Sequence, residues 1–249
     1  MSIDTEDDLD ALKEVGRIVR ETLEAMEEGV RPGATTAEID EIGDQSMIRR
    51  GARSAPRSVY DFPGATCISI NDEIVHGIPS CRVIEPGDLV KLDVVAEKDG
   101  FMADAAITVG VPPLTDEKRR LMACVESAFH KAMAVARPGY RINQIGRAVE
   151  REVRRAGFSV IPELCGHGVG RSIHEEPIVP NYFEPFADQR LKEGMVFTVE
   201  PMIAAGIGLI KRISDGWTIR TADGSLSAHF EHTIVITHGA PILLTAPHG

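Results

Sequence analysis

Apolar residues recur at helical spacing near the start of the chain. They stand at positions 9, 12, 15, 19, 23 and 26, which is typical of one buried face of a helix. Thr35 and Glu38 form a capping signal, so a second helix is predicted after the break at Pro32-Gly33 and before Gly51.

A second stretch of the chain follows the same plan. A helix is predicted from Thr115, with apolar residues at positions 121, 125, 129 and 133. The pattern breaks at Pro138-Gly139, resumes near Ile142 and stops at Gly157, so this stretch also predicts two helices.

Strand-like runs repeat in the same way. Gly87 starts an apolar run in which Asp93 follows six residues later, and Gly194 starts another in which Glu200 takes the same place. The offset between these runs is nearly the offset between the two Pro-Gly breaks, which indicates an old duplication.

The repeat predicts the fold class and the domain organisation. We expect two α/β halves, approximately residues 9–110 and 115–237, fused into a single domain that spans residues 1–249 around a shared cleft. The length of 249 residues is ample for a large core, and 43% hydrophobic with 26% charged residues is ordinary for a folded protein.

A hairpin is predicted where Asp99-Gly100 separates two apolar-rich runs, 89–96 and 101–109. The hairpin would place Asp93 and Asp104 on one face, opposite or diagonal to each other. Opposed carboxylates destabilise a sheet unless one is protonated or a cation lies between them. The alternation of acid and apolar residues around Asp93 is also typical of a strand with one face in solvent.

The second half carries further candidate ligands. A second hairpin signal, Asp223-Gly224, separates the runs 217–221 and 228–236, and Glu231 lies on the second run. His167 stands between glycines in the segment 165–171, where little local packing would justify an imidazole and the backbone can approach a ligand closely.

Together these residues predict a metal site that activates water for hydrolysis. Four carboxylates and one imidazole form a hard, oxygen-rich set suited to a pair of divalent cations. The candidate ligands are Asp93, Asp104, His167, Glu200 and Glu231. No role is predicted for the remaining histidines, which are interpreted as ordinary surface or core residues: His130, His229, His232, His238 and His248.

Charge and composition narrow the partners and the location. A net charge of −11 disfavours nucleic acid and favours a cationic substrate terminus. The apolar stretch 201–210 is too short to span a membrane, and the acidic N-terminus is unlike a signal peptide. The four cysteines show no zinc-type spacing, so we expect reduced thiols and a cytoplasmic protein.

Five segments carry a family resemblance that covers nearly the whole chain. They are similar to type I methionine aminopeptidase, a metalloprotease with the pita-bread or creatinase fold: NDEIVHGIP (71–79), LDVVAEKDGFMAD (92–104), CGHGVGRSIHEEP (165–177), TVEPMI (198–203) and SAHFEHTIVIT (227–237). The resemblance implies an α+β fold with pseudo-two-fold halves, an antiparallel sheet core and outer helices. It also implies excision of the N-terminal methionine from nascent polypeptides during protein maturation.

The resemblance implies a role for each ligand. Asp93 would chelate one ion, Asp104 and Glu231 would bridge both, and His167 and Glu200 would complete the second. The cofactor would be two divalent metal ions, with cobalt, manganese, iron and zinc all compatible with the ligand set. The partners would be the N-termini of nascent peptides and the ribosome, and we expect a monomer.

The resemblance also implies catalytic and substrate-binding residues. Glu200 would carry a proton from water to the leaving amine, His174 would donate to the scissile carbonyl oxygen, and His76 would hold the substrate amide. An apolar slot for the methionine side chain would contain Phe62, Cys67 and Trp217.

Some positions depart from the family. Tyr60 and Asp61 lie in a segment that reads differently from the usual one, Ile173 replaces a frequent Phe, and His229 replaces a frequent Gln. Two rival interpretations remain: a prolidase or aminopeptidase P of the same fold, and a binding protein that keeps the fold without catalysis.

Overall fold

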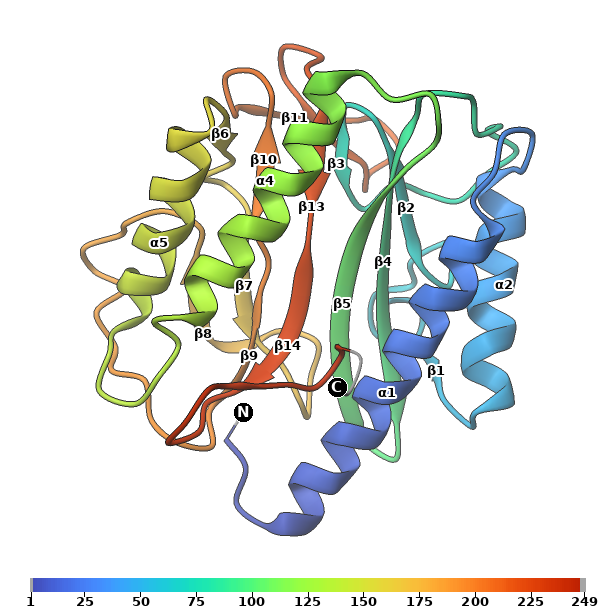
Figure 1. The fold of residues 1–249 in the computed structure, drawn as a ribbon. Coiled ribbons are helices and arrows are strands. Elements are labelled where there is room, and N and C mark those ends of the chain that lie inside the picture. Colours follow the sequence, from blue (N-terminus) through green and yellow to red (C-terminus); the bar gives the residue numbers. More distant parts are fainter. Residues whose placement is uncertain (1, 247–249) are drawn as a thin grey trace.

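One large antiparallel sheet with helices across one face forms the centre of the molecule (Figure 1). The computed structural model describes residues 2–246. In Figure 1, α1 and α4 lie across the sheet, with α2 outside α1 and α5 outside α4. The helices are α1 (Glu6–Gly29), α2 (Thr36–Arg49), α3 (Ala55–Tyr60), α4 (Asp116–Met133) and α5 (Ile142–Arg155).

The large sheet has the order β1-β4-β5-β14-β9-β7-β8, with β2 also paired to β4 and β15 to β14. Its strands are β1 (Arg53–Ser54), β2 (Cys67–Ile70), β4 (Leu89–Lys98), β5 (Phe101–Gly110), β7 (Cys165–Gly168), β8 (Glu175–Pro180), β9 (Val196–Val199), β14 (Glu231–Val235) and β15 (Ile242–Leu243). The pairs that join these strands are antiparallel. The expected α+β class with outer helices is confirmed.

Two small sheets stand beside the large one, with the orders β13-β10-β6 and β11-β12-β3. Their strands are β3 (Glu73–Val75), β6 (Ser159–Val160), β10 (Met202–Ala204), β11 (Ile210–Arg212), β12 (Ile219–Thr221) and β13 (Ser227–His229).

The four predicted long helices form, and local capping explains where they begin. The Thr35 side chain accepts from the Glu38 backbone N–H, and the Glu38 carboxylate accepts in return from Thr35. In α1 the same reciprocal pair is Thr5 and Asp8, so the helix begins before its first apolar residue, Leu9. The acidic N-terminal segment is therefore the first turn of a helix, where negative charge is stabilised by the helix dipole.

The predicted hairpin between β4 and β5 forms with a two-residue turn. Asp99 and Gly100 both have positive φ, 52° and 80°, as a tight turn of this kind requires. Asp93 pairs with Ala106 and Val95 pairs with Asp104, so the two acids are diagonal neighbours on one face.

The strand pairing expected around Asp223-Gly224 is wrong. The run 217–221 becomes β12, which pairs with β11 and β3, whereas the run 228–236 divides into β13 and β14 at Phe230. β13 pairs with β10, and β14 pairs with β5 and β9. Both strands are buried along their whole length, and strand pairing follows which surfaces are buried together.

Two apolar clusters lie between the helices and the sheet, one under each helix pair. Leu12 and Val15 of α1 pack in the first cluster with Leu92 of β4. Leu121 and Phe129 of α4 belong to the second cluster, with β9 and β14. Each helix pair thus covers its own part of the sheet, while the ancestral duplication stays a prediction.

Two further expectations concern membranes and thiols. Within residues 2–246, no helix combines the length and the apolar character needed to cross a bilayer. The four cysteines are unpaired, as their spacing predicted.

Candidate metal centre and cavity

The five predicted ligands come from five neighbouring strands of the large sheet. Asp93 lies on β4, Asp104 on β5, Glu231 on β14 and His167 on β7, while Glu200 directly follows β9. The sheet order β4-β5-β14-β9-β7 therefore brings together residues that are far apart in the sequence.

The strand register aligns the acids on one face. Ala106 is paired with Asp93 on one side and with Glu231 on the other, and directly paired residues point to the same face of a sheet. Because Ala106 has only a methyl group, the space between the two acids stays open. Glu200 stands beside Glu231, since the preceding residue of β9 pairs with His232.

The side-chain donor atoms converge. One atom each from Asp104, His167 and Glu231 lie within 4.8 Å of one another. The Nε2 atom of His167 is 3.8 Å from Oδ2 of Asp104 and 3.4 Å from Oε1 of Glu200. Asp93 also lies beside the cluster, close enough for its carboxyl group to raise the pKa of Asp104.

Burial of these acids makes the bare cluster costly. Burial raises the pKa of Asp104 well above its usual range, and the nearby Glu231, Asp93 and Glu200 raise it further. Burial likewise raises the pKa of Glu200 and of Glu231. Among the described residues, the buried atoms Oδ1 of Asp104 and Oε1 of Glu231 find no hydrogen-bond partner. Divalent cations would satisfy these oxygens and remove the repulsion, so the donor set fits such ions.

The protonation state and the orientation of the His167 ring both suit a metal ligand. Burial lowers its pKa to about 4, so the ring is neutral at pH 7. Its Nδ1 atom is 3.0 Å from the carbonyl oxygen of Gly168 and donates to it, which leaves the Nε2 lone pair facing the acids. Histidines that bind metals usually donate their other ring nitrogen in this way.

Two threonines that the sequence analysis missed hold the acids in place. The Thr198 hydroxyl donates to Oε1 of Glu200 at 2.6 Å and accepts from the backbone N–H of His167 at 3.0 Å. The Thr233 hydroxyl contacts both the backbone N–H and the carbonyl of Asp104. Their place two residues from Glu200 and from Glu231, on the same strand face, was the available signal.

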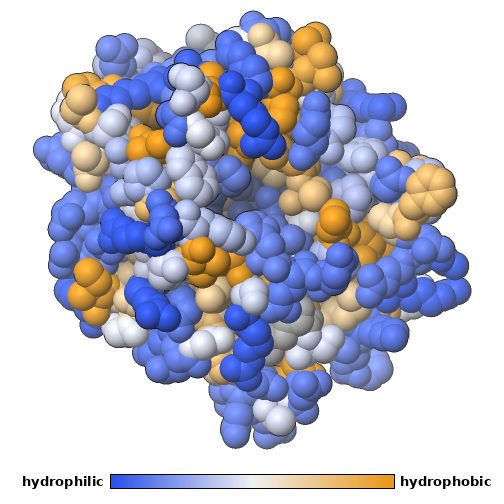
Figure 2. Space-filling view, turned by 180° about the vertical axis from the view of Figure 1, so that it is seen from behind, coloured by the Kyte–Doolittle hydropathy of each residue, from blue (hydrophilic) through white to orange (hydrophobic). Residues whose placement is uncertain are grey.

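A cavity of about 930 Å³ opens over the acids. It is lined by the five candidate ligands and by all five of the other predicted site residues, His76, His174, Phe62, Cys67 and Trp217. Figure 2 looks at the face opposite α1 and α4, where a hollow lies near the middle of the surface.

His76 is placed by an unusual turn after β3. Its φ is 57°, and the next residue, Gly77, donates its N–H to the Ser69 hydroxyl at 3.0 Å. A Cβ atom on Gly77 would lie 2.2 Å from the carbonyl oxygen of Ile68, so only glycine allows this close approach. Burial lowers the pKa of His76 to about 4, which makes it a neutral donor or acceptor.

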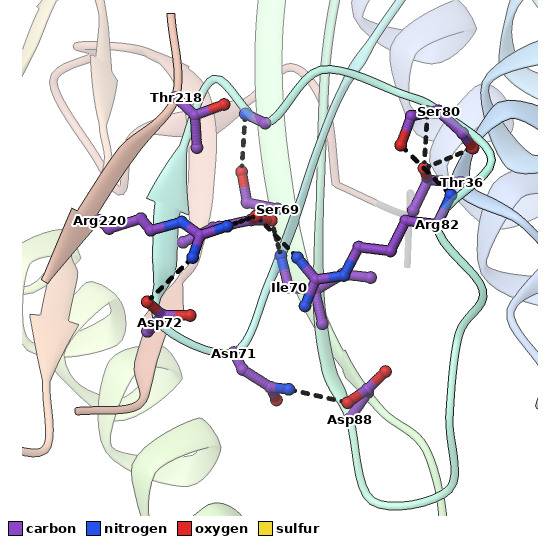
Figure 3. A network of polar contacts seen from close by, with 12 residues as sticks. Thr36, Ser69, Ile70, Asn71, Asp72, Ser80, Arg82, Asp88, Thr218 and Arg220 are labelled. Carbon is purple, nitrogen blue, oxygen red and sulfur yellow. Dashed lines mark hydrogen bonds and ion pairs between the residues drawn. The ribbon is translucent and has the colours of Figure 1, made fainter. Parts of the chain in front are cut away.

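A polar network holds β3 in place (Figure 3). Arg82 and Arg220 both donate to Oε1 of Glu73, at 2.7 Å each, while its Oε2 atom accepts from the backbone of Ile70. Arg220 also approaches Asp72, at 3.7 Å. This network ties β3, the strand that leads into His76, to β12.

His174 lies at the mouth of the cavity, and its ring centroid is 4.2 Å from that of His167. Its Nδ1 atom is 2.7 Å from the Tyr60 hydroxyl. If the hydroxyl donates, Nε2 carries the ring proton and can itself donate into the cavity. The sequence showed Tyr60 only as a departure from the family.

An apolar slot lies beside the acids. Phe62 and Trp217 meet edge to face, with ring centroids 5.1 Å apart and planes at 88°. Cys67 of β2 pairs with Asp93, and burial with the neighbouring carboxylates raises the pKa of its thiol well above the usual range. The slot thus presents aromatic rings and a neutral thiol.

His229 is a residue whose interpretation must be corrected. It was expected to be an ordinary histidine with satisfied contacts, yet it lines the cavity with 2% of its surface exposed. Both ring nitrogens are buried and find no hydrogen-bond partner in the described part of the chain, and Nε2 lies 3.4 Å from Oε2 of Glu231. Its position two residues before Glu231 could have indicated a place at the site.

Comparison with known proteins agrees with this geometry. Residues 10–238 match the model of metallopeptidase family M24. A relative named methionine aminopeptidase 2, from Bacillus subtilis, is 45% identical over 98% of this chain and 99% of its own. The crystal structure of methionine aminopeptidase from Rickettsia prowazekii has a TM-score of 0.95 at 36% identity, covering 99% of this chain and 100% of that one.

The fold and the site therefore define a metal-dependent peptidase, and the chain belongs to metallopeptidase family M24. The resemblance to type I methionine aminopeptidases is confirmed by the relatives that match the chain from end to end. The pita-bread fold is confirmed as well. A prolidase from Pyrococcus furiosus shares it with a TM-score of 0.80, but at 24% identity and over 66% of its own length.

Proposed function

We propose that this chain removes the N-terminal methionine from nascent polypeptides by metal-assisted hydrolysis. The observation that carries the proposal is the convergence of five donor residues from neighbouring strands beneath a cavity that also holds His76 and His174. The rival activity on proline-containing peptides is not favoured, because the relatives with 39–45% identity over nearly the full chain are named methionine aminopeptidases.

Two divalent ions would be held by the five ligands, with Asp104 and Glu231 between them. Asp93 would bind one ion, and His167 with Glu200 the other. When bound, such ions lower the pKa of water and polarise a carbonyl oxygen. Imidazole and carboxylate ligands suit cobalt, manganese, iron and zinc, so supply in the cell decides among them.

The chain's own side chains would move the protons. Glu200, as a carboxylate beside the ions, would take a proton from water and pass it to the leaving amine. His174 would donate from Nε2 to the scissile carbonyl oxygen as negative charge develops there. His76, which also lines the cavity, would hold the substrate amide.

Substrate selection would follow from the floor and wall of the cavity. A free α-amine would bind one of the metal ions, whereas an internal peptide bond offers no such group. The slot formed by Phe62, Cys67 and Trp217 suits a flexible thioether side chain, which packs well against aromatic rings.

The setting of this activity follows from the substrate. Nascent N-termini emerge in the cytoplasm, so we infer a cytoplasmic enzyme that works as a monomer at or near the ribosome. Nucleic acid is not expected as a substrate, given the net charge of −11.

Peptide hydrolysis tests the proposal directly. The full chain with Co²⁺, Mn²⁺ or Fe²⁺ should release methionine from Met-Gly and Met-Ala peptides, and a chelator should stop the release. Acetylated versions of the same peptides are the matched control and should stay intact, because they lack the free amine. Cleavage of Xaa-Pro peptides without methionine release would overturn the assignment.

Replacing Tyr60 with phenylalanine should slow the reaction without weakening substrate binding. The variant removes only the hydroxyl that contacts Nδ1 of His174 at 2.7 Å. Loss of one hydrogen bond of this kind costs about 0.5–1.5 kcal/mol, so kcat should fall roughly 2- to 13-fold. Steady-state kinetics measure kcat and KM, and ¹⁵N shifts of the His174 ring report its tautomer. An unchanged kcat and tautomer would show that Tyr60 does not position His174.

A further inference from the structure

His229 lies where two segments of the chain pass side by side between the large sheet and the small sheet β13-β10-β6. β9 leads into β10 through Glu200 and Pro201, and β13 leads into β14 through Phe230. These two crossings are in register, because His229 pairs with Met202 and His232 pairs with Val199. The crossing therefore turns His229 toward Glu200 and Glu231.

The imidazole of His229 is close enough to share an ion with both acids. One donor atom each from Glu200, His229 and Glu231 lie within 4.8 Å of one another. Nε2 of His229 is 3.4 Å from Oε2 of Glu231. Two atoms that bind one divalent ion at about 2.0–2.2 Å are themselves separated by about 3–3.5 Å, so this spacing is that of two ligands on one ion.

The ring of His229 lacks the hydrogen bonds that a buried imidazole needs. Both ring nitrogens are shielded from solvent and make no hydrogen bond within residues 2–246. Buried polar groups are normally satisfied, and an orphaned one calls for an explanation such as an absent ion. If His229 served only in packing, the unpaired ring nitrogens would destabilise the fold and nothing would offset that loss. An ion beside Glu231 would satisfy one of the two nitrogens.

We propose that His229 is a sixth metal ligand, which binds through a ring nitrogen an ion that Glu200 and Glu231 also hold. The inference rests on the proposed metal site and adds a second imidazole to it. The two groups of converging donors share Glu231, and each contains one histidine, His167 in one and His229 in the other.

The second imidazole has a consequence for metal choice. Imidazole nitrogen favours zinc, iron and other later transition ions, whereas an oxygen-only site suits manganese and magnesium better. His229→Gln should therefore weaken Zn²⁺ and Co²⁺ binding by about tenfold or more and Mn²⁺ binding less. Calorimetry on the metal-free chain measures each dissociation constant.

Nitrogen NMR counts the bound imidazoles. The full chain is labelled with ¹⁵N-histidine, and its ring nitrogen shifts are recorded before and after Zn²⁺ is added. Two rings, His167 and His229, should move to metal-bound shifts. His229→Gln should leave only the His167 signal. The control His238→Gln removes a histidine with 83% side-chain exposure and should leave both signals unchanged.

The outcomes separate this inference from the proposed function. If calorimetry shows zinc binding but only His167 moves, His229 is not a ligand and the five-residue site stands. Equal losses of Zn²⁺ and Mn²⁺ affinity in His229→Gln, with one moving ring in the parent chain, would also rule out His229 as a ligand. If the parent chain binds no divalent ion, both the inference and the proposed metal site are wrong.

Discussion

Asp104→Asn should lose at least one bound ion and nearly all peptidase activity. Asp104 is the acid that lies between the others, within 4.8 Å of donors from His167 and Glu231. An amide is neutral and a much weaker ligand, so it cannot hold two cations together. Loss of the ions removes several kcal/mol of transition-state stabilisation, and kcat/KM should fall by about 1000-fold or more.

Mass spectrometry of metal content, together with methionine release, measures this effect. Asp10→Asn is the matched control, because Asp10 is an exposed acid of α1 that pairs with Lys13 at 3.1 Å. Surface pairs of this kind contribute little. If Asp104→Asn kept two ions per chain, the ligand assignment would be wrong.

The same variant should stabilise the chain when metal is absent. The folded-state pKa of Asp104 is raised, so the folded chain binds this proton more tightly than the unfolded chain does. The resulting stability is present below about pH 4 and is lost as the pH rises toward the folded pKa. Each pKa unit of that shift corresponds to about 1.4 kcal/mol, which asparagine would recover.

Thermal unfolding in the presence of a chelator tests this. The parent chain should be less stable at pH 8 than at pH 5, and Asp104→Asn should narrow the difference. With metal present at pH 8, the parent chain should be more stable than Asp104→Asn, because the parent chain alone gains binding energy from the ions. A parent chain whose metal-free stability rises between pH 5 and pH 8 would contradict the expected repulsion.

His174→Ala should lower kcat by about 100- to 1000-fold while both ions stay bound. Removal of one donor to a developing oxyanion costs about 2.7–4 kcal/mol in other enzymes. His174 lies at the mouth of the cavity, outside both groups of converging donors, and its ring is held by Tyr60. The loss should therefore appear in kcat more than in KM or metal content.

Steady-state kinetics and metal analysis on the same preparation distinguish a histidine that donates to the oxyanion from a histidine that binds metal. His238→Ala removes an exposed histidine and should behave as the parent chain does. If His174→Ala kept its kcat, the oxyanion role would be refuted. If it lost an ion instead, His174 would be a ligand.

Local sequence signals account for much of the fold. The capping pair Thr35 and Glu38 needs only residues three apart, and the Asp99-Gly100 turn needs only two positive φ values, so both are readable without tertiary context. The same hairpin made Asp93 and Asp104 neighbours, as their spacing predicted.

Signals that depend on distant partners failed. Asp223-Gly224 is a sound turn signal, but the strands on either side pair elsewhere, because pairing depends on which surfaces are buried together. The alternation around Asp93 was also typical of a strand with one face in solvent. Lys91, two residues before Asp93, is nevertheless 1% exposed, and its ammonium group donates to the carbonyl oxygen of Asn71 at 2.7 Å. Burial lowers its pKa to about 7.

By itself the sequence determined the long helices, the β4–β5 hairpin and the candidate ligands Asp93, Asp104, His167, Glu200 and Glu231. Only the tertiary structure decided two further contacts. The His229 side chain lies beside the acids because β9–β10 and β13–β14 cross between sheets at the same level, and the Tyr60 hydroxyl contacts the His174 ring. The physical reason is the sequence separation between the residues that interact. Helix caps and tight turns are fixed by neighbours along the chain, whereas the partner of a buried polar group is set by whichever distant strand packs beside it.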